Sequence, residues 1–200
     1  MGKVLMFGGT FNPPHIAHRL MLQAAAELKN IDKILVIPTN IPPHKEVANY
    51  CPSKEHRLNM CRLLLEGVEN AVVSDMELNR EGKSYTYDTL IELKEKYDDL
   101  SILIGADMIT TFFSWYRYKD VLNLCDIIAI RRPGIDNRSF DKAVETLRNE
   151  GGNITVLDAK MPDVSSTDIR EETDDETQLS KKVPNNIYEY CKRNGLYESK

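Results

Sequence analysis

Short, largely apolar runs recur along the chain at intervals that suit the strands of a buried sheet. They lie at residues 4–7, 34–37, 71–73, 101–104, 127–130 and 154–157. Most are followed at once by a glycine, a proline or a charged residue. Continuous apolar runs of this length are typical of strands that are covered on both faces, as they are in parallel sheets.

Stretches with helical periodicity lie between these runs. Apolar residues spaced three or four apart favour helices at residues 20–28, 53–65, 88–97, 140–150 and 186–193. In the third of these stretches we expect Leu90, Ile91 and Leu93 to face the core. Ser53 is a typical residue to precede a helix, and Gly195 is a typical residue to end one.

The alternation of strands and helices predicts an α/β fold with a doubly wound parallel sheet. The first strand, helix and second strand fit within forty residues, which is the length of a βαβ unit with a right-handed crossover. Two hundred residues suit one domain. We therefore expect a single domain over residues 1–200, with an α/β core at 1–165 and a small C-terminal helical segment at 166–200.

Charge and cysteine content narrow the class of protein. The formal net charge is -5, so the surface as a whole does not favour nucleic acid. The N-terminal residues do not match a signal peptide, and no apolar stretch approaches the length that spans a membrane. The four cysteines form no CxxC pair, which argues against a zinc or dithiol site and fits the reducing cytoplasm. We expect a cytoplasmic protein.

The most informative stretch follows the first strand. Gly8 and Gly9 allow the backbone to approach a ligand closely, and the start of the next helix offers unpaired N–H groups to an anion. His15 and His18 are three residues apart, so they share one face of a helix. The pattern indicates a phosphate site. A lone pair of glycines is more often typical of an ordinary strand–helix turn, here with two solvated histidines.

Other candidate ligand residues follow later strands, where loops line the crevices of α/β sheets. Lys45 has two interpretations: it reaches a phosphate, or it is an ordinary loop lysine in solvent. Gly105 and Asp107 suit a ribose, because glycine permits close approach and a carboxylate accepts from two hydroxyl groups. Asp107 also suits the position before a helix. One of Arg131 and Arg132 is expected to face phosphate, and the sequence does not say which.

A second anion site is predicted after the last strand. Ser165 and Asp168 have capping-box spacing, and hydroxyl groups crowd the start of a helix. Arg170 follows about one turn later, where it can bind phosphate. The simpler interpretation is a well-capped helix. If both sites form, the parallel topology puts them on the same edge of the sheet, where a triphosphate can lie across them.

Two strings resemble known signatures. GGTFNPPHIAH at 8–18 resembles the signature of the HxGH nucleotidyltransferase superfamily, and VSSTDIR at 164–170 resembles its second signature, ISSTxIR. The segments between them are similar to those of bacterial nicotinate-nucleotide adenylyltransferases. These segments are PPHK at 42–45, SYTYDTL at 84–90, IGAD at 104–107, SWYRY at 114–118, RRPG at 131–134 and NGLY at 194–197. Asn12 replaces a frequent aspartate, and Ala17 replaces the glycine of the superfamily name.

The resemblance implies a Rossmann-like nucleotidyltransferase fold and a specific reaction. ATP and nicotinate mononucleotide would give nicotinate adenine dinucleotide and pyrophosphate, a step of NAD biosynthesis, with Mg²⁺ carried by the substrate and no metal ligands from the protein. It assigns catalytic roles to His15, His18 and Arg170. The resemblance assigns ATP binding to Gly8, Gly9, Thr10, Phe11, His15, His18, Gly105, Asp107, Ser165, Ser166, Thr167 and Arg170. It assigns binding of the mononucleotide to Asn12, Lys45, Thr86, Trp115, Tyr116 and Arg132.

Alternatives remain from two classes. One is another adenylyltransferase of the superfamily, which uses nicotinamide mononucleotide or phosphopantetheine. The aromatic SYT and SWY segments argue against phosphopantetheine, which has no ring to stack. The other is a noncatalytic nucleotide-binding regulator, against which His15, His18 and Arg170 argue. A homo-oligomer is left open.

Overall fold

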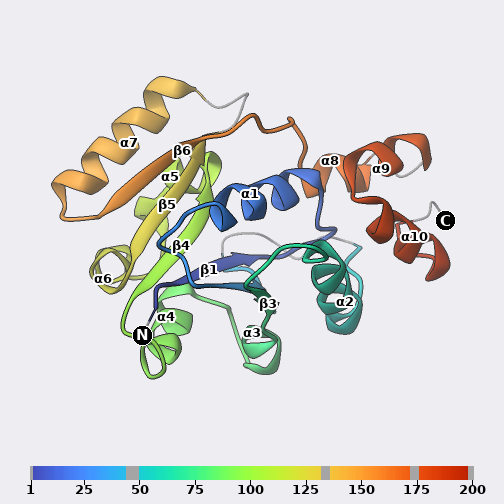
Figure 1. Ribbon diagram of the computed structural model, residues 1–200, viewed down its shortest axis with the longest axis horizontal. Helices are drawn as coiled ribbons and strands as arrows, with labels where there is room; N and C mark the ends of the chain where they lie inside the picture. Colours follow the sequence, from blue (N-terminus) through green and yellow to red (C-terminus); the bar gives the residue numbers. More distant parts are fainter. Residues whose placement is uncertain (1, 44–49, 132–135, 172–175, 198–200) are drawn as a thin grey trace.

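The computed structural model describes residues 2–43, 50–131, 136–171 and 176–197. Its centre is a sheet of six parallel strands in the order β3-β2-β1-β4-β5-β6 (Figure 1). The strands are β1 (Val4–Gly9), β2 (Lys33–Pro38), β3 (Ala71–Val73), β4 (Leu100–Gly105), β5 (Asp126–Arg131) and β6 (Ile154–Asp158). The prediction of a doubly wound parallel sheet is confirmed.

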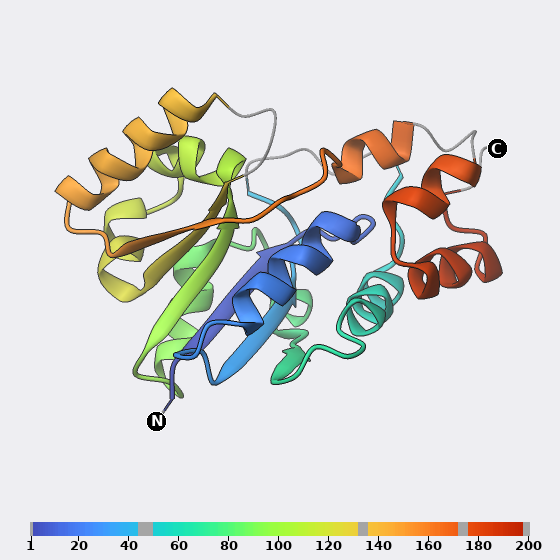
Figure 2. The same cartoon turned by 45° about the horizontal axis from the view of Figure 1, so that its top comes forward.

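Helices cover both faces of this sheet (Figures 1 and 2). They are α1 (Ile16–Ala26), α2 (Lys54–Leu64), α3 (Met76–Asn79), α4 (Thr86–Lys94), α5 (Ala106–Thr111), α6 (Tyr118–Leu124), α7 (Asn137–Asn149), α8 (Ser166–Glu171), α9 (Glu176–Lys182) and α10 (Asn185–Arg193), with a 3₁₀ turn, η1, at Phe112–Ser114. No helix in these described ranges is long and apolar enough to cross a membrane.

Alternate side chains of each central strand enter different layers of the core. In β1, Leu5 and Phe7 belong to a cluster with residues of α1, α2 and α10. Val4 and Met6 belong to a second cluster, with residues of α4 to α7. Burial on both faces explains why the strands appear in the sequence as continuous apolar runs.

The chain reverses its direction of winding at the centre of the sheet. From β1 it proceeds outward through β2 to β3, and it then returns to the other side of β1 as β4. Loops that follow β1 and β4 therefore diverge and leave a crevice at the carboxyl ends of these two strands. This is the position at which doubly wound proteins bind ligands.

The C-terminal helices pack against the side of the domain that carries α2 (Figures 1 and 2). Ile187 and Cys191 of α10 and the following Tyr197 are buried in the same cluster as Leu5 and Phe7 of β1. The C-terminal segment is thus continuous with the core, and it brings Tyr197 close to the turn after β1.

Two local predictions are wrong. Ile91 is 42% exposed, because α4 turns Thr89, Leu90 and Leu93 inward instead. Asp107 does not precede helix α5: Gly105 holds that position, and Asp107 lies in the first turn.

Candidate active site

A cleft of about 640 Å³ opens at the carboxyl ends of β1 and β4. This volume is in the range of pockets that bind nucleotides and other small molecules. Sixteen residues proposed from the sequence line it: Gly8, Gly9, Thr10, Phe11, Asn12, His15, His18, Thr86, Gly105, Asp107, Trp115, Tyr116, Ser165, Ser166, Thr167 and Arg170. The other two, Lys45 and Arg132, lie outside the described residues.

The turn after β1 folds tightly beneath the cleft. Phe11 has a positive φ of 49° and is almost fully buried, with its ring packed edge-on against Phe7. A Cβ on Gly9 would lie 3.1 Å from the Phe11 ring. Glycine at this position therefore lets the aromatic ring fold under the turn while the backbone above it stays open to the cleft.

His15 and His18 lie side by side, but not as two residues of one helix. His15 precedes α1, and its backbone N–H donates to Nδ1 of His18 at 3.2 Å. The two rings stack with centroids 3.7 Å apart and an angle of 25° between their planes. Because Nδ1 of His18 accepts this hydrogen bond, the neutral ring carries its proton on Nε2, as a donor.

The segment of the second predicted anion site forms a reciprocal capping box. The backbone N–H of Asp168 donates to Oγ of Ser165, and the backbone N–H of Ser165 donates to Oδ2 of Asp168, both at 3.1 Å. This arrangement holds the start of α8 rigidly at the rim of the cleft.

Two hydrogen bonds join this helix to the turn after β1. Arg170 donates from Nη1 to the backbone oxygen of Asn12 at 2.7 Å, and the hydroxyl group of Ser166 donates to the backbone oxygen of Pro13 at 2.9 Å. Residues more than 150 positions apart thus meet at one edge of the sheet. The structure thus brings the segments of the two predicted anion sites to the same edge of the sheet.

The side chain of Asn12 is 2% exposed, and both of its polar atoms bond to the protein. Nδ2 donates to the backbone oxygen of Tyr50 at 3.1 Å, and Oδ1 accepts from the hydroxyl group of Tyr197 at 2.6 Å. Burial raises the pKa of Tyr197, so its hydroxyl group remains a neutral donor. An amide fits here because it is both donor and acceptor, whereas a carboxylate only accepts.

The far end of the cleft is aromatic. Trp115 is 8% exposed and packs on Phe112, with ring centroids 4.6 Å apart. Tyr116 is 47% exposed, and its ring lies 4.6 Å from that of Tyr85. Thr86 is the first residue of α4, where backbone N–H groups lack partners within the helix. This end of the cleft can accept a flat ring with an acceptor substituent.

Arg131 is not among the cleft-lining residues. Its guanidinium group pairs with Asp141 at 2.8 Å and Asp158 at 3.0 Å and lies over the ring of Phe140. The hydrogen bond to Asp141 contributes most to raising the pKa of Arg131. Arg131, the last residue of β5, therefore joins β5 to α7 and β6 instead of facing the cleft.

Sequence reasoning missed two buried charged residues near the cleft. Arg57 is 3% exposed and donates from Nη1 to the backbone oxygens of Thr10, at 3.0 Å, and Thr39, at 2.6 Å. Its position four residues before Cys61, on the apolar face of α2, is the signal that could have found it. Glu77 is 2% exposed and lines the cleft. Glu77 stands between the apolar residues Met76 and Leu78, and this alternation is typical of a strand with its charged residue in solvent. The pattern therefore gave no sign that Glu77 is buried.

Comparison with known proteins shows the family to which the chain belongs. Residues 6–172 match the model of the cytidylyltransferase-like family, and the chain belongs to that family. Individual relatives define a narrower group within this family. The chain is 38% identical to a nicotinate-nucleotide adenylyltransferase of *Bacillus subtilis* over the whole of both chains. It is 36% identical to a probable nicotinate-nucleotide adenylyltransferase of *Fusobacterium nucleatum*, over 89% of this chain and 91% of the relative. Within the family, it is thus a member of the nicotinate-nucleotide adenylyltransferases.

Solved structures share the fold. A *Plasmodium falciparum* nicotinic acid mononucleotide adenylyltransferase complexed with NaAD superposes with a TM-score of 0.80 at 21% identity, over 98% of each chain. A second structure of that enzyme, complexed with APC, has a TM-score of 0.77 at 20% identity, again over 98% of each chain. The Rossmann-like nucleotidyltransferase fold that the sequence predicts is confirmed.

Proposed function

We propose that this enzyme transfers the adenylyl group of ATP to nicotinate mononucleotide and releases pyrophosphate, as a step of NAD biosynthesis. The observation that carries the proposal is the junction of two anion-binding helix starts, α1 and α8, through Arg170 and Asn12 at the edge of one cleft. Full-length relatives that bear the name of this activity support it.

In this reaction a 5′-phosphate oxygen of the mononucleotide attacks the α-phosphorus of ATP. The bond from the α-phosphorus to the bridging oxygen breaks, and that oxygen leaves with pyrophosphate. The protein's task is to orient the two substrates and to stabilise charge. Orientation contributes about 7–11 kcal/mol in favourable cases, and one preorganised hydrogen-bond donor contributes a factor of roughly 10²–10³ in rate.

The residues of the two anion sites divide this work. His18 presents Nε2–H to the triphosphate, and His15 stacks against it and limits its rotation. Arg170 and the backbone N–H groups after Ser165 bind the β- and γ-phosphates. These donors stabilise the charge that develops on the departing pyrophosphate.

Magnesium fits this site as an ion that is bound mainly by the phosphates of the substrate. The described lining of the cleft contains two carboxylates, Glu77 and Asp107, on separate helices. The described chain has no cluster of three or more side chains suited to hold a metal ion. When bound to the phosphates, Mg²⁺ neutralises their charge, and it commonly keeps most of its ligands from water and phosphate.

The rest of the cleft suits the two nucleosides. Asp107, in the first turn after Gly105, would accept from the hydroxyl groups of the adenosine ribose. Trp115 would stack on the pyridine ring, and backbone N–H groups near Thr86 and Tyr116 would receive its carboxylate. A pocket that presents only donors leaves the NH₂ group of the amide analogue mispaired, which costs about 1–3 kcal/mol per buried group.

Pyrophosphate release tests this assignment. Purified enzyme with ATP and Mg²⁺ is given nicotinate mononucleotide, nicotinamide mononucleotide or phosphopantetheine in parallel. We expect kcat/KM for the acid mononucleotide to exceed that for the amide by more than about tenfold, as one mispaired buried group predicts. Equal efficiency with both mononucleotides would contradict the donor-only pocket. Turnover with phosphopantetheine alone would assign the protein to another reaction.

We also propose that residues 1–200 form one domain that works in the cytoplasm. The shared core cluster of β1 and α10 supports the first point. The cytoplasmic location is supported by the cysteines: all four are free thiols, and burial raises the pKa of Cys125 and Cys191 to about 12.

Sedimentation of the purified protein would establish its oligomeric state.

A further inference from the structure

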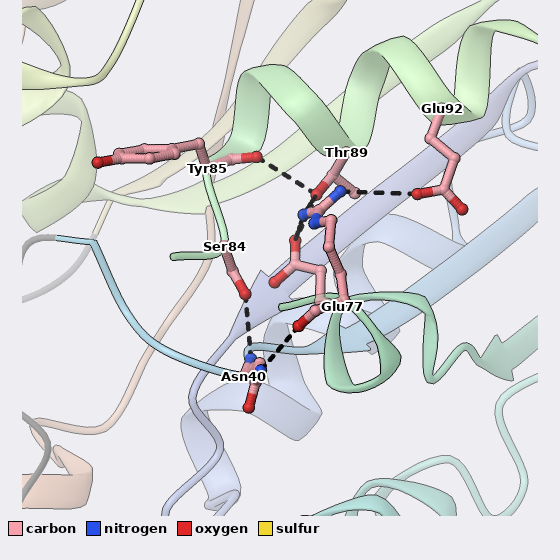
Figure 3. Close-up of polar contacts among 7 residues, drawn as sticks. Asn40, Glu77, Ser84, Tyr85, Thr89 and Glu92 are labelled. Carbon is pink, nitrogen blue, oxygen red and sulfur yellow. Dashed lines mark hydrogen bonds and ion pairs between the residues drawn. The ribbon is translucent and has the colours of Figure 1, made fainter. Parts of the chain in front are cut away.

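The cleft contains a buried carboxyl group that the reaction outlined above does not use. Glu77 lies in α3, between the loop that follows β2 and the start of α4 (Figure 3). It is 2% exposed and lines the cleft. A buried carboxyl group is costly unless it has hydrogen-bonding partners, so its partners indicate what it holds in place.

The main partner of Glu77 is a threonine of α4. Oγ1 of Thr89 donates to Oε1 of Glu77 at 2.7 Å, and both side chains are buried. Arg80 completes the group: its Nη2 donates to Oγ1 of Thr89 at 2.7 Å and lies 4.0 Å from Oε1 of Glu77. Its Nη1 lies 3.6 Å from Glu92, one turn further along α4. Figure 3 shows the side chains of Glu77 and Thr89 meeting beneath α4.

This group is joined directly to the start of α4. The backbone N–H of Thr89 donates to the backbone oxygen of Tyr85 at 3.2 Å, and Oγ1 of Thr89 lies 3.3 Å from the same oxygen (Figure 3). Tyr85 has no side-chain capping bond. The position of the first turn, with the backbone N–H groups around Thr86, therefore depends on how firmly Thr89 is held.

The same group reaches the loop after β2. Asn40 donates from its backbone N–H to Oγ of Ser84 at 3.1 Å and from Nδ2 to the backbone oxygen of Arg80 at 2.8 Å (Figure 3). The backbone N–H of Ser84 donates to the backbone oxygen of Ile41 at 2.9 Å. Two walls of the cleft, the loop at 39–43 and the segment 84–86, are thus fixed to one another around Glu77.

We propose that Glu77 is a positioning residue that acts through Thr89 to hold the backbone donors at the start of α4 and so sets the preference for the acid mononucleotide. This inference rests on the proposed function, because it concerns the donors assigned there to the nicotinate carboxylate. A donor that moves by a fraction of an ångström binds the carboxylate less well. The amide, which never matched these donors, is affected less.

Thr89→Val tests the proposal, because valine keeps the shape of threonine and removes the hydroxyl group. We expect KM for nicotinate mononucleotide to rise roughly tenfold, the size of one lost buried hydrogen bond. KM for ATP, KM for nicotinamide mononucleotide and kcat at saturation stay unchanged. The acid-to-amide ratio of kcat/KM therefore falls. Thr89→Ser, which restores the hydroxyl group, should restore the ratio.

Thr146→Val is a matched control. Thr146 is also a helical threonine, and its hydroxyl group donates to the backbone oxygen four residues earlier, that of Lys142, at 2.8 Å. It is a half-buried residue of α7 and does not line the cleft. This variant should leave every kinetic constant as it is in the wild type.

A second variant separates positioning from stability. Thr89→Val alone leaves the carboxyl group of Glu77 without its main partner and is expected to lower the melting temperature. The double variant Glu77→Met/Thr89→Val removes both members of the pair, which is often nearly neutral for stability. We expect it to melt closer to the wild type and still to have the raised KM and the reduced acid-to-amide ratio.

The outcomes are distinct. A stable double variant with the reduced ratio supports the proposal. Wild-type KM values and ratio in both variants overturn it, as does a parallel rise in KM for both mononucleotides. Titration calorimetry of nicotinate mononucleotide with each protein gives the same comparison without turnover. If the wild-type enzyme binds the acid mononucleotide but releases no pyrophosphate, the proposed function is overturned. The calorimetric comparison of the variants then decides this inference on its own.

Discussion

Tyr197, near the C-terminus, is predicted to stabilise the turn after β1. Its hydroxyl group donates to Oδ1 of Asn12 at 2.6 Å, and the two residues are 3% and 2% exposed. Its ring also lies edge-on to that of Tyr50, with centroids 5.4 Å apart. Tyr197→Phe removes the hydroxyl group and preserves the ring, so it isolates the hydrogen bond from the packing.

The cost of this substitution follows from burial. Oδ1 of Asn12 would lose its donor in a place that water does not reach, and a buried polar atom without a partner costs about 1–3 kcal/mol. For a chain of this size, each kcal/mol shifts the melting temperature by roughly 2–4 °C. With a cost of about 2 kcal/mol, we expect the melting temperature to fall by roughly 4–8 °C.

Differential scanning calorimetry checks this value against a matched variant. Tyr188 is a half-buried tyrosine of α10 whose hydroxyl group has no hydrogen bond within the described part of the chain. Tyr188→Phe should therefore leave the melting temperature nearly unchanged. If Tyr197→Phe melts with the wild type, or if the two variants fall by the same amount, the hydrogen bond to Asn12 does not stabilise the turn.

Three further predictions concern the site. His18→Ala should lower kcat by at least about a hundredfold, the scale of one lost donor, with the melting temperature little changed; near-normal turnover would remove His18 from catalysis. Arg170→Ala should raise KM for ATP more than KM for the mononucleotide, and steady-state kinetics with the opposite pattern would place it elsewhere. Burial raises the pKa of Glu77, against the smaller effects of Thr89 and Arg80, so the folded state holds this proton more tightly than the unfolded state does. Its contribution to stability is therefore largest below the ordinary glutamate pKa and is lost as the pH rises through the raised value. The melting temperature of Glu77→Gln relative to wild type should increase from pH 4 to pH 7, and a constant difference would contradict the raised pKa.

Local sequence signals determined much of this fold. All six strands were predictable as apolar runs. The four central strands β1, β2, β4 and β5 are largely buried on both faces and so must be apolar throughout, whereas the edge strands β3 and β6 are only partly buried. The local structure of the two segments proposed to bind anions was also predictable. The turn after β1 and the start of α8 both depend on short-range geometry, in which glycine, capping residues and hydrogen bonds three residues apart are visible in the sequence.

Tertiary contacts decided the rest. The sequence cannot show that Tyr197 bonds to Asn12, or that Arg170 does, since these residues meet only after the sheet and the C-terminal helices have assembled. Glu77 is a sharper case. Its neighbours Met76 and Leu78 favour a strand with Glu77 in solvent, but a single helical turn instead buries its carboxyl group against Thr89. Periodicity reports which face a regular element buries, whereas a four-residue turn takes its orientation from whatever packs against it.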